Sequence, residues 1–190
     1  MLIENEFEIA SPVDKVWDYL YDMNNLVPCV PGAELTELNG EQFKGLVTSK
    51  VGPVTVKFGG EGEVVSRDAT ARRIEVDASG AETKGKGTAV VNLVAQLSPS
   101  GKGSKVSVRM DLTLSGPIAQ FGRGMVADVM AVIMKSFGAA IEENIGRLER
   151  GESLVGARAT SGLAIGINAA KIALRRVVGR LLGIRSWYES

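Results

Sequence analysis

The stretch that decides the fold is residues 105–141, KVSVRMDLTLSGPIAQFGRGMVADVMAVIMKSFGAAI. Its first ten residues alternate, with Val106 and Met110 among the apolar positions and polar residues between them, which predicts a strand with one buried face. Ser115–Pro117 then opens a long helix that we expect to run to about Arg150. Apolar residues recur along it at the spacing of one buried helical face. They are Ile118, Met125, Val129, Ile133, Phe137 and Ile141.

Strand-like runs joined by turns precede this stretch. With 105–114 there are six in series from residue 33 onward, and Asn39-Gly40 is a strong hairpin signal. Residues 2–9 alternate like a half-buried strand, and 13–20 follow as a helix, with Ser11 as its N-cap and Pro12 at its first position. Hairpin-length connections predict an antiparallel meander. We therefore expect an α+β domain over 1–150, a curved antiparallel sheet wrapped around a long C-terminal helix in a helix-grip arrangement.

Composition excludes several kinds of site. The 190 residues contain no histidine and a single cysteine, Cys29. A histidine-based triad, a histidine metal site and a thiolate metal cluster are therefore excluded, and the lone cysteine fits a reducing compartment. The N-terminal sequence MLIENEFEIA lacks the apolar segment that a signal peptide contains. We expect no catalytic residues, no metal site and a protein that is not an enzyme.

Glycines are frequent on the predicted strands, where they mark bends or close approaches. A sheet bent by glycines, with small inward side chains and methionines on the helix, leaves room for an apolar ligand. The alternative is a solid core with strands bent for packing alone. From alternation and helical spacing, the predicted ligand-binding residues are Leu26, Phe43, Val47, Phe58, Ala89, Val91, Met110, Phe121, Met125 and Val129.

The C-terminal residues differ in charge from the rest of the chain. The whole chain has net charge zero, but residues 158–190 hold six basic residues and one acidic residue. Residues 151–162 are rich in Gly, Ser and Ala and predict a flexible linker, and 163–190 predict a basic amphipathic helix and tail. Such a helix fits an anchor on an anionic lipid surface; docking on its own domain or on a protein partner is the alternative. The predicted membrane-binding residues are Leu163, Ile167, Lys171, Leu174, Arg175, Arg176, Val178, Arg180, Leu181 and Trp187.

Three segments carry a resemblance to a known family: EIASPVDKVWDYLYD (8–22), LVPCVPGAEL (26–35) and GEQFKGLVTSKVGPVTVKFGGEGEV (40–64). Over residues 1 to about 150 the chain resembles the SRPBCC (START-like, Bet v 1-like) superfamily. More narrowly it is similar to the CoxG family, named after the G subunit of carbon monoxide dehydrogenase. The resemblance implies a helix-grip fold that encloses a hydrophobic cavity.

The resemblance also implies a function. Proteins of this family accompany molybdenum hydroxylases of the carbon monoxide dehydrogenase type and attach them to the cytoplasmic membrane. A respiratory quinone, menaquinone or ubiquinone, is the implied ligand, and the redox cofactors would belong to the partner enzyme. We expect a peripheral protein on the inner face of the cytoplasmic membrane that binds no nucleic acid. A recruitment or assembly factor without a ligand, and a START-like cyclase or dehydratase, are the alternatives.

Overall fold

The computed structural model describes residues 1–51 and 54–157, with only the backbone at 50, 51, 54 and 121. In this part of the chain, seven strands form one antiparallel sheet in the order β1-β7-β6-β5-β4-β3-β2. The strands are β1 (Leu2–Ile9), β2 (Ala33–Asn39), β3 (Gln42–Val51), β4 (Val54–Asp68), β5 (Arg73–Glu82), β6 (Thr88–Ser100) and β7 (Gly103–Ser115). The helices are α1 (Val13–Tyr21), α2 (Met23–Leu26), the 3₁₀ turns η1 (Val27–Cys29) and η2 (Gly116–Phe121), and α3 (Gly122–Glu149).

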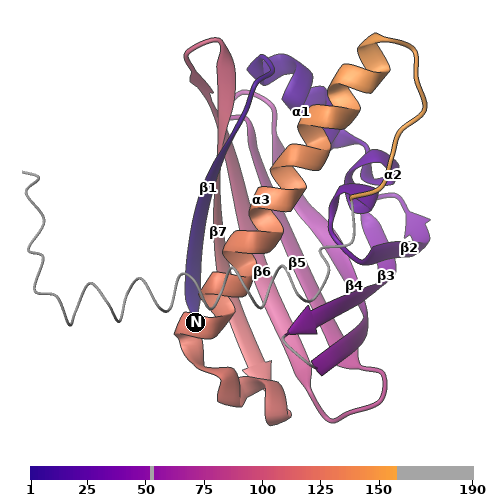
Figure 1. Cartoon of the computed structure of the whole chain (residues 1–190), viewed down its shortest axis with the longest axis vertical. Helices are drawn as coiled ribbons and strands as arrows, with labels where there is room; N and C mark the ends of the chain where they lie inside the picture. Colours follow the sequence, from indigo (N-terminus) through magenta and orange to yellow (C-terminus); the bar gives the residue numbers. More distant parts are fainter. Residues whose placement is uncertain (52–53, 158–190) are drawn as a thin grey trace, which may run out of the picture.

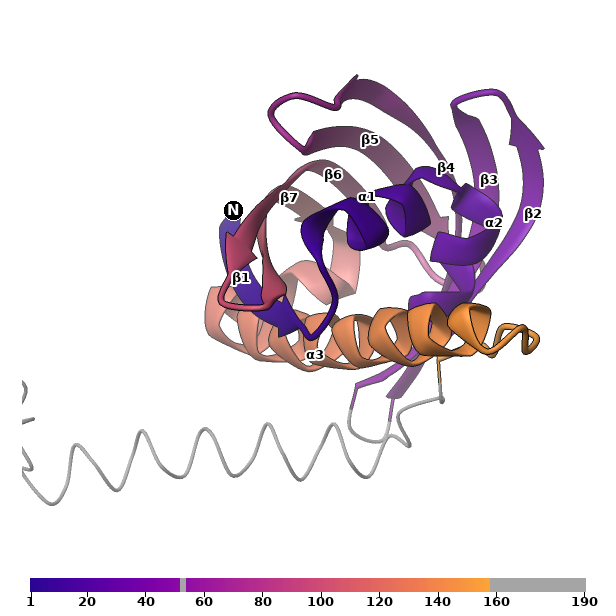
Figure 2. The ribbon, with the colours of Figure 1, turned by 90° about the horizontal axis from the view of Figure 1, so that it is seen from above.

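The predicted helix-grip arrangement is confirmed. β2 to β7 form a meander, and β1 pairs with β7 to complete the sheet. The sheet curves into an arch, and α3 lies across its open, concave side (Figures 1 and 2). α1 follows β1 and closes one end of the concavity, where β1 ends and β7 begins (Figure 2).

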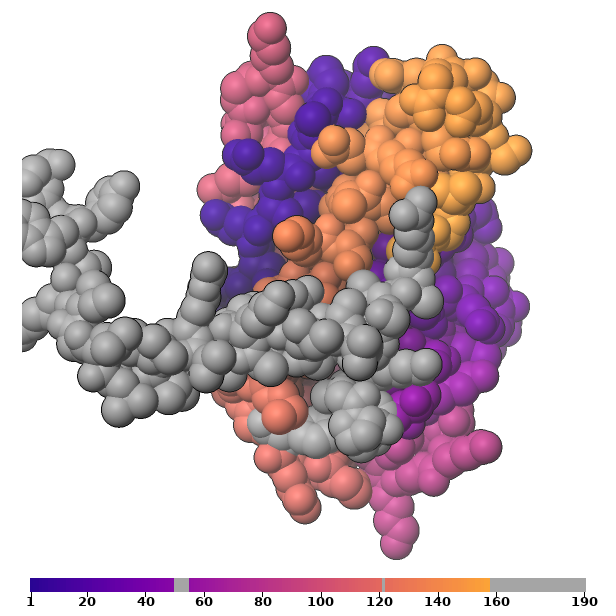
Figure 3. Space-filling view, viewed as in Figure 1, coloured from indigo at the N-terminus to yellow at the C-terminus, as the bar shows by residue number. Residues whose placement is uncertain are grey.

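The packed core lies at this closed end. Val16 of α1 and Ile141 of α3 are fully buried there. The ring of Phe7 packs edge-on against that of Phe137, with centroids 6.1 Å apart. Gly138 leaves space for the ring of Phe7, because a Cβ at this position would lie 2.6 Å from Cδ2 of Phe7. In the space-filling view the C-terminal half of α3 accordingly lies directly against β1 (Figure 3).

Two predicted helix starts are wrong. Ser11 does not cap α1: Pro12 is the N-cap residue with ψ 148°, and no side chain caps the helix. The Ser11 carbonyl instead accepts a hydrogen bond from Oγ of Ser104 on β7, so this long-range contact sets the backbone before the helix. The long helix begins at Gly122, because the positive φ of Gly122 separates η2 from α3, and Gly116, also with positive φ, separates β7 from η2.

A row of glycines crosses three strands on the concave face. Gly60 pairs with Gly45 on one side and with Gly80 on the other. A Cβ on Gly60 would overlap the carbonyl oxygen of Ser79 and lie 2.9 Å from Cα of Gly80. The predicted close approach at these strand glycines is thereby confirmed, and it allows the sheet to bend sharply at this row.

Candidate ligand-binding face

The inward-facing residues of the sheet differ in solvent exposure along its length. On β6, Val91, Leu93 and Ala95 point inward and remain partly exposed, whereas Leu97 is only 3% exposed. Because β6 is paired on both sides, by β5 and β7, these side chains point to the concave side, although Val91 also borders the groove on the other face. In α3, none of residues 122–133 is buried. We call this region the concave site: the inward residues of β3 to β6 together with residues 122–133.

The position of the concave site follows from the topology. It lies toward the end of the arch where β7 ends and α3 begins, opposite the end that α1 closes. No described helix packs into this end as α1 does at the other (Figure 2). The glycine row lies here as well and contributes backbone in place of side chains. An apolar concavity of this kind suits an apolar ligand.

The structure brings most of the predicted ligand-binding residues to this face. Val47 and Phe58 are direct partners on β3 and β4, and Val47 is 40% exposed. On α3, Val129 is half-buried. Met125 is 47% exposed and lies on the opposite side of the helix from the buried Met134, nine residues away, so it faces away from the sheet. The half-buried members on the strands are Phe43, Phe58, Ala89 and Val91.

Besides Met125, three predicted ligand-binding residues lie apart from this group. Met110 is 3% exposed and belongs to the packed core. Leu26, at the end of α2, is half-buried and packs against the same core. The side chain of Phe121 is outside the described part of the chain. Ligand contact stays a prediction for all ten residues.

Asn5 is a polar residue on the inward face of β1. It lies between Ile3 and Phe7 in the strand alternation and pairs with Val108 of β7. Its Nδ2 is buried without a hydrogen-bond partner, and no other side-chain nitrogen or oxygen in the described residues is left so. Asn5 is not among the predicted site residues, although an asparagine in the apolar phase of strand 2–9 is a visible signal.

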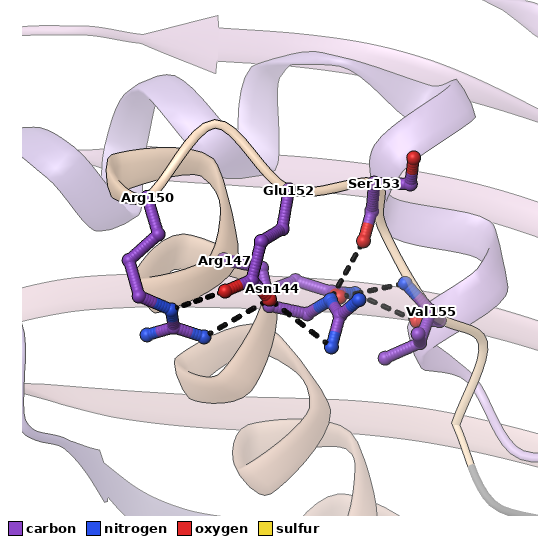
Figure 4. Close-up of polar contacts among 6 residues, drawn as sticks. All are labelled: Asn144, Arg147, Arg150, Glu152, Ser153 and Val155. Carbon is purple, nitrogen blue, oxygen red and sulfur yellow. Dashed lines mark hydrogen bonds and ion pairs between the residues drawn. The ribbon is translucent and has the colours of Figure 1, made fainter.

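A second buried polar group lies at the closed end, around Asn144 of α3. Its Nδ2 donates to the carbonyl of Val155 and its Oδ1 accepts from the Val155 N–H, each at 2.9 Å (Figure 4). Its Nδ2 also donates to the hydroxyl of Tyr19 at 3.1 Å. The Tyr19 hydroxyl also donates to the carbonyl of Asn25 and contacts Sγ of Cys29 at 3.2 Å. Burial, followed by the hydrogen bond with Cys29, raises the pKa of Tyr19. Every hydrogen bond of this cluster is therefore made with protein groups, and we assign the cluster a structural role.

The segment after α3 is fastened to the domain. Besides the Asn144 contacts, Nε of Arg147 donates to the carbonyl of Ser153 at 2.6 Å (Figure 4). The N–H of Ala157 donates to the carbonyl of Pro28 at 2.6 Å. The first residues of the predicted linker 151–162 are thus hydrogen-bonded to the domain, and 158–162 lie outside the described residues.

The convex face of the sheet is polar and acidic. A groove of about 450 Å³ crosses β2 to β6. Glu61, Glu63 and Asp77 border it from the face opposite the glycine row. Lys44 forms an ion pair with Glu37 at its edge. This lining does not suit an apolar ligand, and within the described residues no group of three His, Cys, Asp or Glu side chains could hold a metal ion.

The predicted membrane-binding residues all lie beyond Ala157. None of them is in the part of the chain that the structure describes. They are Leu163, Ile167, Lys171, Leu174, Arg175, Arg176, Val178, Arg180, Leu181 and Trp187. Among the described helices, α3 is long and apolar enough to cross a membrane by length and composition; its C-terminal half packs in the domain core.

Solved structures with this fold are numerous. A conserved protein from Geobacillus kaustophilus superimposes with a TM-score of 0.69 at 19% identity, covering 77% of this chain and 96% of that protein. A protein from Thermus thermophilus gives 0.57 at 19% identity, with 78% and 99% covered. Ara h 8.0201 gives 0.50 at 20% identity, with 76% and 97% covered. At these identities the likeness shows the fold alone.

The sequence itself identifies the family. No curated protein is similar enough to this chain to count as a match. The family model that describes the G subunit of carbon monoxide dehydrogenase (CoxG) matches residues 6–146. These residues span the sheet and nearly all of α3. The chain therefore belongs to the CoxG family of carbon monoxide dehydrogenase subunits.

Proposed function

We propose that this chain is a non-enzymatic carrier that binds a respiratory quinone, menaquinone or ubiquinone, in the concave site. It recruits a carbon monoxide dehydrogenase-type molybdenum hydroxylase to the inner face of the cytoplasmic membrane and links its electrons to the respiratory chain. The name of the family supports this choice of partner enzyme. The sequence contains no histidine. Because histidine is the commonest general base in enzymes, this supports a carrier over an enzyme.

The observation that carries ligand binding is the accessible apolar surface inside the arch. Val91 and Leu93 of a central strand keep surface that a packed core would bury. Removing such surface from water yields about 25 cal/mol per Å². A long isoprenoid chain would cover it.

The charge of the C-terminal residues supports membrane recruitment. Residues 158–190 hold six basic residues and one acidic residue, so the rest of the chain is net acidic. Each basic residue near an anionic membrane contributes about 1 kcal/mol. The fastened segment 153–157, which precedes these residues in the chain, ends beside η1.

Vesicle sedimentation tests the membrane half of the proposal. The full chain is mixed with phosphatidylcholine vesicles with and without phosphatidylglycerol, and a variant with Lys171, Arg175, Arg176 and Arg180 changed to Gln is compared with it. A matched control loses four exposed lysines of the domain instead, namely Lys57, Lys84, Lys86 and Lys102.

We expect the full chain and the control to sediment with anionic vesicles and the tail variant to remain in the supernatant. The loss of four charges corresponds to about 4 kcal/mol, or roughly a thousandfold in the partition constant. If the tail variant sediments as well as the control does, the tail is not the membrane anchor.

A further inference from the structure

We propose that the side-chain amide of Asn5 is the hydrogen-bond donor that receives a carbonyl oxygen of the ligand and sets its orientation. This inference rests on the proposed function, because it assigns a polar contact to the ligand of the concave site. The oxygen-bearing head group would lie near Asn5, toward the end that α1 closes, and the apolar tail would point toward the glycine row.

The energetic argument starts from the unpartnered donor. A buried N–H without an acceptor destabilises a folded protein, whereas an apolar side chain of the same shape at that place does not. Asn5 has Ile3 and Phe7 as its neighbours on the same strand face, so an apolar residue would suit its position. A binding partner that brings an acceptor removes this cost, and an amide donor then favours ligands with a carbonyl over hydrocarbons of the same shape.

The register places Asn5 at the inner end of the concave site. Asn5 pairs with Val108, and Val108 pairs with Ala95 of β6. Ala95 is half-buried and small, whereas Val108 and Ile74 in the same row are 5% and 7% exposed and belong to the core. Asn5 itself is only partly buried, but its Nδ2 has no accessible surface, so the amide has to rotate for Nδ2 to meet a ligand oxygen.

The distance along the sheet suits an elongated ligand. Six residues separate Ala95 from Ala89, the β6 partner of Gly80 in the glycine row. At about 3.3 Å per residue this is roughly 20 Å. A ring with a carbonyl at the Asn5 row and a flexible apolar chain would extend from the inner end to the open end of the arch.

The test uses two probes with the same carbon skeleton: menadione (2-methyl-1,4-naphthoquinone) and 2-methylnaphthalene, which lacks the carbonyls. Both are titrated into the full chain and into its Asn5→Leu and Asn5→Ala variants. Asn92→Leu is the matched control, because Asn92 points to the convex face and donates to Asp77. The carbonyl stretching frequency of bound menadione is recorded by infrared spectroscopy.

We expect both Asn5 variants to bind menadione about tenfold more weakly, and to bind 2-methylnaphthalene as tightly as the unchanged chain. The carbonyl frequency should be lowered in the unchanged chain and in Asn92→Leu, and should return toward its value in hydrocarbon solvent in both Asn5 variants. Without ligand, Asn5→Leu should unfold at the same temperature or higher. If it unfolds earlier because leucine overfills the site, Asn5→Ala decides the comparison.

The failures are distinguishable. If the chain binds both probes but the Asn5 variants bind menadione with unchanged affinity, the amide does not donate to the ligand and this inference is wrong. The proposed ligand site would stand. If the unchanged chain binds neither probe, the proposed function fails and this inference fails with it.

Discussion

The amide of Asn144 pairs with the backbone of Val155 through two hydrogen bonds of 2.9 Å each. Asn144 is fully buried, and this pairing brings the chain after α3 back onto the domain. Together with the contact of Ala157 with Pro28, it holds the last described residues before the basic C-terminal stretch against the domain.

Replacing Asn144 by leucine should release this segment. The backbone groups of Val155 would lose their partners, and we expect the free energy of unfolding to fall by about 2–3 kcal/mol. Hydrogen exchange at the Val155 amide should accelerate. Glu152→Gln is the control, since it removes only exposed ion pairs with Arg147 and Arg150, and should cost less than about 1 kcal/mol. Unchanged exchange at Val155 in the leucine variant would contradict the assigned role.

The glycine row predicts a strong position dependence on β4. A Cβ on Gly60 meets the backbone of β5, which cannot move without disturbing the sheet, so Gly60→Ala should cost more than about 2 kcal/mol. Its neighbour Gly59 points outward, and a Cβ there would lie 3.4 Å from the flexible end of Leu46. Gly59→Ala should therefore change stability by less than about 1 kcal/mol. Equal effects in chemical denaturation would mean that the curvature does not depend on this contact.

The buried hydroxyl of Tyr19 predicts a loss of stability at high pH. Its pKa is raised in the folded state, so the unfolded chain ionises first, above its ordinary value of about 10. The stabilisation is complete below that pH and is lost as pH rises toward the folded pKa. We expect the stability difference between the unchanged chain and Tyr19→Phe to shrink between about pH 10 and 12. A difference that stays constant over this range would show that the hydroxyl is not held neutral by the fold.

Space in the concave site predicts that it tolerates a larger side chain. Val91→Phe should lower the free energy of unfolding by less than about 1 kcal/mol, because the ring extends into accessible space. The same change at Val106, which is 2% exposed in the packed core, should cost about 1–3 kcal/mol. Val91→Phe should also weaken menadione binding, since the ring occupies part of the ligand's place. Equal destabilisation at the two positions would indicate a solid core beneath α3.

Much of the fold could be predicted from the sequence, because its signals are local. Alternation in 105–114, the turn at Asn39-Gly40 and the helical spacing up to Ile141 each reflect neighbours a few residues apart. The two helix starts were predicted wrongly because they depend on contacts between residues far apart in the sequence or on the local backbone path. Ser104 reaches Ser11 across 93 positions, and the φ of Gly116 and Gly122 depends on how the chain passes from β7 to α3.

The candidate site was less predictable for the same reason. Alternation identified inward residues such as Val47, Phe58 and Val91, but it could not separate a partly exposed position from a packed one such as Met110. That distinction depends on α1, which closes only one end of the arch. Asn144 gave no signal in sequence, because its partners Tyr19 and Val155 come from separate segments.

Extraction of the purified full-length protein from its native cells, followed by mass spectrometry of the extract, tests quinone carriage most directly. The Val91→Phe variant, expressed and purified in the same way, is the control. We predict a menaquinone or ubiquinone in near-equimolar amount in the unchanged protein and a clearly smaller amount in the variant. An extract with no more quinone than that of the variant would contradict a quinone carrier.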